Sequence, residues 1–432
     1  MATVQAKRSD IALIRRRSGV VLNRISQGLI ALVGLLVLYL LIKAAAGNPD
    51  VFFQQVLNGL QLGFIYALIA LGYTMIYGIV KLINFAHGDV FMVGAFTSYF
   101  AISLGDLHRW PLLVWPAMGE NSATVIGTLT VILLSMLVSG VLAIVMERFA
   151  YRPLRDKPRI AALITAIGVS FFLEYFAALP FVYTNNYITY PRPFEIDVFH
   201  ASSISVVVIG LAWGLFVLSL VITGVFTWLG KRGNQRAYVW RRHPLLQLLM
   251  LLAGFLAVVL TLVGGTSGIG AEWDLTVSNV ALVVMISSIL LQVVLQYIVQ
   301  YTRLGKAMRA SAYDKPVARL MGINVDMVIA ATFAIGGGLA GAGGVLYATA
   351  FKQVHYLMGI MPGLKAFVAA VIGGIGSIPG ALVGALIMGQ TEVLSAGFIS
   401  TPMRDAIAFS MLIIVLLIRP QGIFGEPPGE KV

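Results

Sequence analysis

The sequence contains no cysteine and little charge, and each absence excludes a class of protein. Without cysteine the 432-residue chain can form no disulfide, no thiolate metal site and no cysteine nucleophile. Its five histidines are widely spread, so no zinc-type cluster is expected. Only 11% of the residues are charged and 59% are hydrophobic, whereas a soluble domain carries roughly 25% charged residues. Such a chain cannot cover a water-facing surface, and we expect lipid to be its main solvent.

Nucleotide-binding motifs are also missing. No G-x-x-x-x-G-K-[ST] stretch occurs, so the chain has no loop of that kind to hold nucleotide phosphates. A glycine run at 264–270 superficially resembles a dinucleotide-binding turn, but no soluble strand–helix unit surrounds it, and we interpret it as chance. The net charge of +12 comes from basic residues in short loops between apolar runs. That placement indicates membrane topology, and no nucleic-acid partner is expected.

Long apolar runs fill most of the chain. A helix needs about 20 such residues to cross the bilayer, and twelve segments approach that length. Three of them (88–104, 363–376 and 380–397) are short or interrupted by glycine, so we predict about ten to twelve crossings. The predicted fold class is an all-α, polytopic transmembrane helical bundle with broken or re-entrant helices. The other candidate segments are 28–46, 56–80, 124–146, 160–180, 203–229, 246–264, 277–300, 327–350 and 403–420.

Clusters of Lys and Arg mark one side of the membrane. Four clusters precede the first segment or follow the fourth, sixth and eighth, always an even number of crossings apart. By the positive-inside rule that side is the cytoplasm, and both termini are predicted to be cytoplasmic. The first segment also resembles a secretory signal with a cleavage site at 44–46. Its apolar run is long for a signal and Lys43 interrupts the approach, so we favour an uncleaved anchor.

Polar residues between two apolar runs are the first candidates for a functional site. Asn84, His87, Gly88 and Asp89 follow the second segment with almost no loop before the third. Polar side chains at membrane depth are costly and usually face a cavity or a partner, so these residues are predicted to line the translocation pathway or a gate. A tight cytoplasmic turn, capped by Asn84 or Asp89, is the alternative interpretation.

Glycine marks two further features of the second half. About a dozen residues separate Pro362 from the next glycine pair, too few for a relaxed span, which predicts a half-helix or re-entrant element. Small residues also recur every four positions, which predicts close helix packing, with direct substrate contact as the alternative. The pathway or gate candidates are Gly373, Gly374, Gly376 and Pro379, and the packing candidates are Gly336, Ala340, Gly344, Gly380 and Gly384.

The most informative predicted cytoplasmic loop is 303–326, where basic residues alternate with small and apolar ones. Pro316 behind Asp314 indicates two short helices with a break between them. A helix of this kind can lie in a groove of a soluble partner. An ordinary basic loop retained on the cytoplasmic side would show a similar composition.

These segments together resemble a known family, the LivH-type permease of bacterial branched-chain amino acid ABC importers. The resemblance covers roughly 51–180 and 275–432, and its motifs are highly specific for the family but less so for the substrate. The matching runs, in family order, are 58–59, 67–79, 83–89, 147–155, 166–170, 303–324, 365–379 and 419–423.

The resemblance implies a permease subunit that is not an enzyme, has no catalytic residues and binds no cofactor or metal. It implies cytoplasmic ATP-binding cassette ATPases that bind ATP and Mg, a second related permease, an extracytoplasmic amino-acid-binding protein and a place in the inner (plasma) membrane. Branched-chain or other neutral amino acids are the expected substrates. The family's ATPase-coupling positions fall at Gly305, Arg309, Ala310, Asp314, Ala318, Gly322 and Ile323.

The resemblance also divides the chain. Residues 1–50 are an N-terminal extension with one extra transmembrane helix, and 201–272 an insertion with two. The permease core occupies 51–200 and 273–432, with the coupling segment at 303–326.

Three other functions remain open. Permeases for urea and short amides share the His-Gly run, which changes the cargo but not the mechanism. An ion-coupled secondary carrier would use the intramembrane carboxylates Glu174 or Glu392. A channel or structural membrane protein would show no concentrative uptake.

Overall fold

The computed structural model describes residues 47–155, 157–194, 197–201 and 275–424, together with Tyr39 and Lys43. The predicted segments 203–229 and 246–264 lie outside these residues, as does 28–46 apart from Tyr39 and Lys43. Within the described part, six helices are long and apolar enough to cross a membrane. A bent pair, with a 68° angle between 87–103 and 107–114, would make a seventh. The predicted fold class, a polytopic helical membrane bundle, is confirmed.

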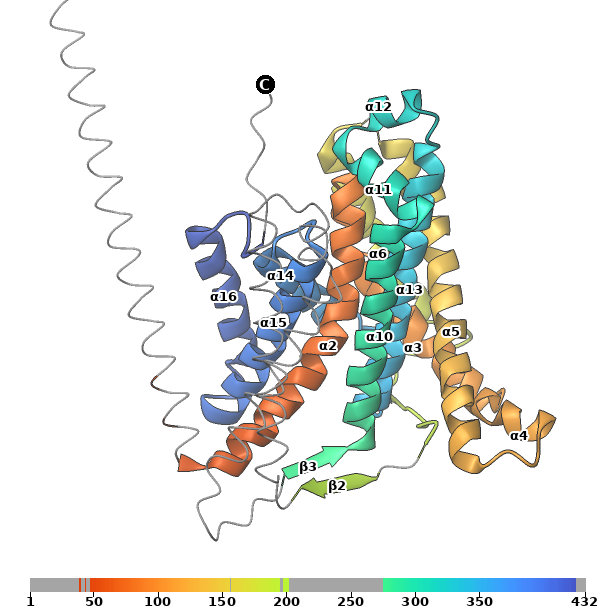
Figure 1. Cartoon of the computed structure of the whole chain (residues 1–432), viewed down its shortest axis with the longest axis vertical. Coiled ribbons are helices and arrows are strands. Elements are labelled where there is room, and N and C mark those ends of the chain that lie inside the picture. Colours follow the sequence, from red (N-terminus) through yellow and green to blue (C-terminus); the bar gives the residue numbers. More distant parts are fainter. Residues whose placement is uncertain are drawn as a thin grey trace, which may run out of the picture.

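The centre of the bundle is α2 (Pro49–Val80), a 32-residue helix that crosses it diagonally (Figure 1). A proline in the first turn favours the start of α2, because its missing N–H is not needed there. The helix ends where Lys81 takes the left-handed conformation (φ 62°) and its amide donates to the Tyr77 carbonyl oxygen at 2.9 Å. Residues 62–71 are all buried, so α2 is a core helix rather than a lipid-facing one.

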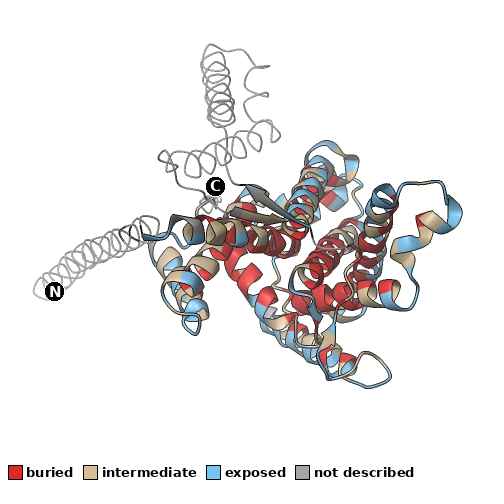
Figure 2. Cartoon of the chain, turned by 90° about the horizontal axis from the view of Figure 1, so that it is seen from below, coloured by how far each residue is buried: buried red, intermediate tan, exposed pale blue. Residues whose placement is uncertain are grey.

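Two groups of helices flank α2. On one side lie α14, α15 and α16, and on the other α3, α5, α6, α10 and α13, as Figure 1 shows. Seen end-on, the buried residues lie where the helices meet, and exposed residues lie on the rim (Figure 2). The bounds are α3 (His87–Ser103), η1 (Leu107–Arg109), α4 (Trp110–Val114), α5 (Glu120–Met146), η2 (Glu147–Tyr151), η3 (Arg152–Leu154), α6 (Arg159–Ala177), α10 (Asn279–Tyr301), α13 (Val325–Phe351), α14 (Ile360–Gly373), α15 (Ile378–Phe398) and α16 (Arg404–Ile418).

Small residues allow the helix backbones to approach closely. Gly336 of α13 faces α2, where a Cβ built on it would lie 3.4 Å from the Cα of Gly72. A Cβ on Gly344 would collide with the carbonyl oxygen of Phe91 in α3. Ala340, between these two glycines, is fully buried. Close approach of this kind increases van der Waals contact between helices that have no hydrophobic drive to associate in lipid.

The segment predicted as a half-helix is the 14-residue α14. It ends at two glycines whose backbones need the left-handed side of conformational space, Gly374 (φ 106°) and Gly376 (φ 102°). Ser377 then caps α15, accepting a hydrogen bond from the Gly380 amide at 3.2 Å. This tight turn brings α15 back against α14, where Gly384 lies against the Ala369 carbonyl.

The 303–326 segment forms α11 (Arg303–Tyr313) and α12 (Lys315–Leu320) at one end of the bundle (Figure 1). The break falls at Asp314, whose side chain accepts a hydrogen bond from the Val317 amide at 3.0 Å. Pro316 sits in the first turn of α12. The predicted pair of short helices with a break is therefore confirmed.

Two short antiparallel ribbons lie among the helices, β1 (Ile188–Thr189) with β4 (Gln353–Val354), and β2 (Val198–Ala201) with β3 (Leu275–Ser278). The second ribbon lies at the end of the bundle opposite α11 and α12 (Figure 1). Its last pair joins Ala201 to Leu275, so the two ends of the predicted insertion meet at one point. Thr276 anchors the ribbon to α2 by donating its amide and hydroxyl hydrogens to Gln54 Oε1, at 3.1 and 3.2 Å.

Because these ends are paired, the core should tolerate removal of the segment between them. Replacing 202–274 with Asn-Gly, a sequence that favours a two-residue hairpin turn, would join β2 to β3 directly. We expect a monodisperse protein in detergent with a melting temperature within about 2 °C of the parent, because ~1 kcal/mol shifts the melting temperature of a chain of this length by only about that much. Removing α10 instead, which packs against α2, should abolish folding. Aggregation of the Asn-Gly variant would show that the insertion is part of the core.

Candidate functional site

A cavity of about 510 Å³ lies between α2, α13, α14, α15 and α16. The segments around it are the start of α2, the ends of α13 and α15 and the start of α16. Because α11 and α12 contact the opposite ends of α2 and α13, the cavity lies in the half of the bundle remote from them. Its volume falls in the range of small-molecule sites, about 300–1,000 Å³.

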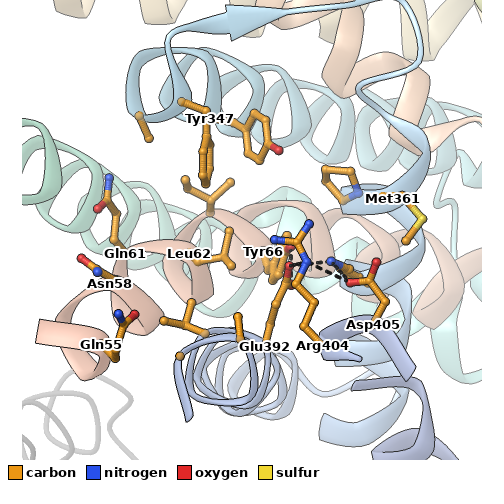
Figure 3. A pocket seen from close by; sticks show the side chains of 18 residues that line it. Gln55, Asn58, Gln61, Leu62, Tyr66, Tyr347, Met361, Glu392, Arg404 and Asp405 are labelled. Carbon is orange, nitrogen blue, oxygen red and sulfur yellow. Dashed lines mark hydrogen bonds and ion pairs between the residues drawn. The ribbon is translucent and has the colours of Figure 1, made fainter. Parts of the chain in front are cut away.

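Four charged side chains gather on one wall of the cavity (Figure 3). Lys365 Nζ lies 2.5 Å from Glu392 Oε1 and 2.7 Å from Asp405 Oδ1. Arg404 Nε lies 3.5 Å from Asp405 Oδ1 and 3.8 Å from Glu392 Oε1. The Tyr66 hydroxyl donates to Glu392 Oε2 at 2.8 Å. Two cations thus face two carboxylates, and the formal charges of the group cancel.

The local surroundings explain why each helix can carry its charged residue at this position. Lys365 stands in the apolar α14 and is only 4% exposed, a position that is tolerable because two carboxylates face it. Glu392 lies in the buried face of α15. Arg404 and Asp405 open α16, and the first turn of a helix favours a carboxylate. The cluster therefore joins three helices that follow one another in the chain.

The remaining walls of the cavity have a different chemistry. Leu62 and Ile65 of α2, Tyr347 and Phe351 of α13 and Val393 of α15 contribute apolar surface. Three amides from the first turns of α2 complete the rim. These are Gln55, Asn58 and Gln61. A charged wall opposite an apolar one suits a small molecule with a polar head and an apolar side chain.

The predicted pathway residues of the first half do not line this cavity. Asn84, His87 and Asp89 are buried where α2, α3 and α6 meet. Asn84 Oδ1 accepts a hydrogen bond from the Tyr151 hydroxyl at 2.5 Å, and Asp89 Oδ2 accepts one from Ser170 at 2.5 Å.

The neighbouring positions pack just as closely. The His87 ring lies 4.7 Å from that of Tyr73, and Gly88 packs against Gly359. The first-half residues thus form a second buried polar cluster, separate from the cavity.

The other predicted pathway residues also lie elsewhere. Gly373, Gly374, Gly376 and Pro379 form the turn between α14 and α15, outside the cavity lining. Gly373 and Gly380 touch across this turn, and Gly374 contacts Gly422. Close backbone approach accounts for glycine at 373, and a positive φ angle accounts for it at 374 and 376.

The predicted coupling residues differ in their exposure: two are buried, two are exposed and three are half-buried. Gly305 and Ala318 are buried, and a Cβ on Gly305 would collide with the carbonyl oxygens of Ile298 and Val299. Arg309 is exposed and donates a hydrogen bond to the Val299 carbonyl. Among the other positions Gly322 is exposed, while Ala310, Asp314 and Ile323 are half-buried.

Sequence reasoning missed an apolar surface on the same segment. Tyr313 is 95% exposed, Leu320 86% and Met321 77%. We call these three side chains the apolar knob; Tyr313 is the last residue of α11, and Leu320 and Met321 are at the end of α12. Large apolar side chains exposed on a segment that is predicted to face water are candidates for an interaction site.

Ion pairs attach the 303–326 segment to the bundle. Asp326, in the first turn of α13, lies 2.6 Å from Arg152, 2.5 Å from Arg155 and 3.8 Å from Arg319 of α12. Lys315 Nζ donates to the Val80 carbonyl oxygen at the end of α2, at 3.3 Å. Burial, followed by the nearby Arg155, lowers the pKa of Lys315. Movement of α12 would therefore be transmitted to α2 and α13.

The cavity residues Tyr66, Arg404 and Asp405 were also missed, although a signal was present. A lysine inside a 14-residue apolar helix needs a carboxylate nearby, and Glu392 and Asp405 lie in the next two helices.

Within the described ranges, no three His, Asp or Glu side chains gather in an arrangement that could hold a metal ion.

Comparisons with known proteins place these features in a family. Residues 55–416 match the model of the branched-chain amino acid transport system permease component. The chain is 34% identical to the LivH permease proteins of Salmonella typhimurium and Escherichia coli, over 88% of its length and 98% of theirs. It is 33% identical to the BraD permease protein of Pseudomonas aeruginosa, over 89% of its length and 100% of BraD. No solved structure matches the chain.

Proposed function

Because the chain belongs to the family of branched-chain amino acid transport permeases, we propose that it is the membrane subunit of an ATP-binding cassette importer for branched-chain or other neutral amino acids. The LivH and BraD relatives are named as permease proteins of high-affinity branched-chain amino acid transport systems. In this proposal the chain supplies the route through the bilayer, and a partner ATPase binds ATP and Mg. A second permease and an extracytoplasmic amino-acid-binding protein complete the assembly.

The observation that carries the proposal is the position of the apolar knob. It lies on a basic segment, which the positive-inside rule assigns to the cytoplasm. The same segment is joined by Lys315 to α2, whose other end lines the cavity. A cytoplasmic motor that pushes on α12 would thus act on the helix that borders the bound solute. In this proposed orientation the cavity belongs to the extracytoplasmic half of the bundle.

The partners of the intramembrane carboxylates support this function over an ion-coupled carrier. A coupling carboxylate must gain and lose a proton or sodium ion during transport. Glu392 accepts hydrogen bonds from Lys365 through Oε1 and from Tyr66 through Oε2, so both of its oxygens already have a partner within the protein. Glu174, the other candidate, accepts a hydrogen bond from Ser170 at 3.4 Å and lies outside the cavity lining, next to the buried polar cluster that contains Asp89. Uptake that a protonophore abolishes while ATP stays constant would support the carrier instead.

A substitution in the apolar knob tests the proposed docking. Leu320→Asp places a charge where the partner's surface would be apolar, and loss of a hot-spot contact of about 2 kcal/mol weakens binding roughly 30-fold. We expect the ATPase to stop copurifying and uptake to fall in proportion, with unchanged membrane insertion. Ala117→Asp is the matched control, because Ala117 is exposed in the loop between α4 and α5, and these two helices meet at the end of the bundle opposite α12 (Figure 1). Normal copurification of Leu320→Asp would remove the knob from the interface.

A further inference from the structure

We propose that the cavity holds the zwitterionic head of the transported amino acid, with Arg404 binding its carboxylate and Asp405 its ammonium group. The inference rests on the proposed function and names the residues that would recognise its substrate. It assigns a solute site to the permease chain itself, at the junction of α2, α14, α15 and α16.

The first step is that Arg404 has hydrogen-bond donors that are available to a ligand. Lys365 is 4% exposed and its ammonium group is occupied by Glu392 and Asp405. Arg404 is 46% exposed, and its only ion-pair contacts among the described residues run through Nε at 3.5 and 3.8 Å. Its two terminal nitrogens therefore remain available on the cavity wall (Figure 3). A guanidinium fork of this kind matches a carboxylate in a bidentate geometry.

The second step is that one carboxylate oxygen is also available. Asp405 is 34% exposed, and both of its ion pairs use Oδ1. Glu392 is 6% exposed and uses both oxygens, Oε1 for Lys365 and Oε2 for Tyr66. Asp405 Oδ2 is thus the acceptor that a ligand ammonium group can reach. Arg404 and Asp405 are consecutive, and the carboxylate and ammonium groups of an α-amino acid share one carbon atom.

The third step concerns net charge. The four side chains sum to zero, so a zwitterion enters without leaving an unpaired charge in a site of low dielectric. A ligand with only one of the two charges would leave either Arg404 or Asp405 without its counterpart. Urea and short amides carry no charge, so they cannot form an ion pair with either Arg404 or Asp405. The cavity therefore discriminates by chemistry between the two cargoes that the sequence leaves open.

The apolar wall determines which kind of side chain the transported amino acid can have. Leu62, Ile65, Tyr347, Phe351 and Val393 face the cavity around the charged wall. They offer no charge to pair with a charged or strongly polar side chain. An aliphatic side chain buries apolar area there at about 25 cal/mol per Å². The substrate class that fits is thus a neutral α-amino acid with an aliphatic side chain.

Equilibrium binding of radiolabelled L-leucine to the full-length chain in nanodiscs tests the assignment. Competition uses 4-methylpentanoate, which lacks the ammonium group, isoamylamine, which lacks the carboxylate, and urea. We expect each single-charge analogue to compete at least about tenfold more weakly than L-leucine, and urea not at all, because a hydrogen bond to a charged group is lost. Equal competition by either analogue, or no binding of L-leucine, would overturn the assignment.

Arg404→Gln shows which group Arg404 recognises. The variant should bind L-leucine at least about tenfold more weakly, yet bind isoamylamine as the parent does, because that ligand has no carboxylate to lose. A merely structural role would weaken both ligands equally. Arg404→Lys keeps the charge without the fork and should fall between parent and Arg404→Gln. Arg419→Gln, an exposed change beyond the far end of α16, is the control and should bind normally.

Uptake separates failure of this inference from failure of the proposed function. If cells with the complete importer accumulate L-leucine and Arg404→Gln accumulates it equally well, the transport function stands and the zwitterion site is wrong. If the complete importer moves no neutral amino acid, the proposed function itself fails.

Discussion

Replacing Lys365 with methionine is expected to cost the protein about 3–5 kcal/mol of stability, because Glu392 and Asp405 would lose the cation between them. Methionine has a similar length and suits an apolar helix, so the loss comes from charge rather than from volume. Both carboxylates would then share Arg404, whose contacts are longer. Thermal unfolding in detergent should show a melting temperature lower by about 3–6 °C, the shift that this loss of stability produces in a chain of this length.

A second substitution should restore part of the lost stability. In the double variant Lys365→Met/Glu392→Gln the buried carboxylate is removed with its partner, and Tyr66 can still donate to an amide oxygen. We expect the melting temperature to recover by at least half. Lys306→Met is the matched control, because Lys306 is exposed on α11 and should unfold at the parental temperature. A parental melting temperature for Lys365→Met alone would show that the ion pairs contribute nothing.

Replacing Gly344 with leucine is expected to force α13 away from α3. Even the Cβ would meet the Phe91 carbonyl oxygen and lie 2.9 Å from the Ala95 amide nitrogen. Because these are backbone atoms, a rotamer change cannot relieve the contact. Overpacking a core costs typically about 1–3 kcal/mol, and a backbone clash falls at or above the upper end of that range.

Gly168→Leu provides the matched control for this helix contact. Gly168 lies in α6, also a predicted membrane helix, and a Cβ built on it has nothing within 4 Å. The yield of monodisperse protein should fall severalfold for Gly344→Leu and stay unchanged for Gly168→Leu. Equal yields would mean that α13 and α3 are not in close contact in the membrane.

The sequence predicted the helices better than it predicted the site. Apolar runs locate spans because backbone groups in lipid must be paired within a helix. The predicted break at Asp314 is present for the same local reason, a capping side chain followed by a proline. The two ribbons were not predicted, since β2 and β3 pair across the whole of the 202–274 segment.

The cavity escaped prediction because its residues are distant in sequence. Tyr66 and Glu392 are 326 positions apart, and only the packing of α15 on α2 brings them together. Glu392 was noticed as an intramembrane carboxylate but could not be assigned a partner without the fold. His87 and Asp89 were noticed for the same reason, and the structure places them in a separate buried cluster. A buried polar residue marks a place of interest, but its neighbours decide its role.

One helix links the two functional ends of the molecule. Near its start, α2 lines the cavity with Leu62, Ile65 and Tyr66, and at its end Val80 accepts a hydrogen bond from Lys315. A continuous 32-residue helix is stiff enough to carry a displacement from α12 to the cavity. In the function proposed here, α2 would transmit the movement of α12 to the solute site. Within the proposal, the energy for this movement comes from the partner ATPase.

The source of that energy is tested most directly by L-leucine uptake in cells that contain this chain and its partners. A protonophore is added while ATP is held constant, and ATP is depleted in a parallel sample while the ion gradient is kept. If a separate ATPase drives transport, accumulation will survive the protonophore and stop when ATP is depleted. Accumulation that follows the ion gradient and ignores ATP would contradict this view of the protein.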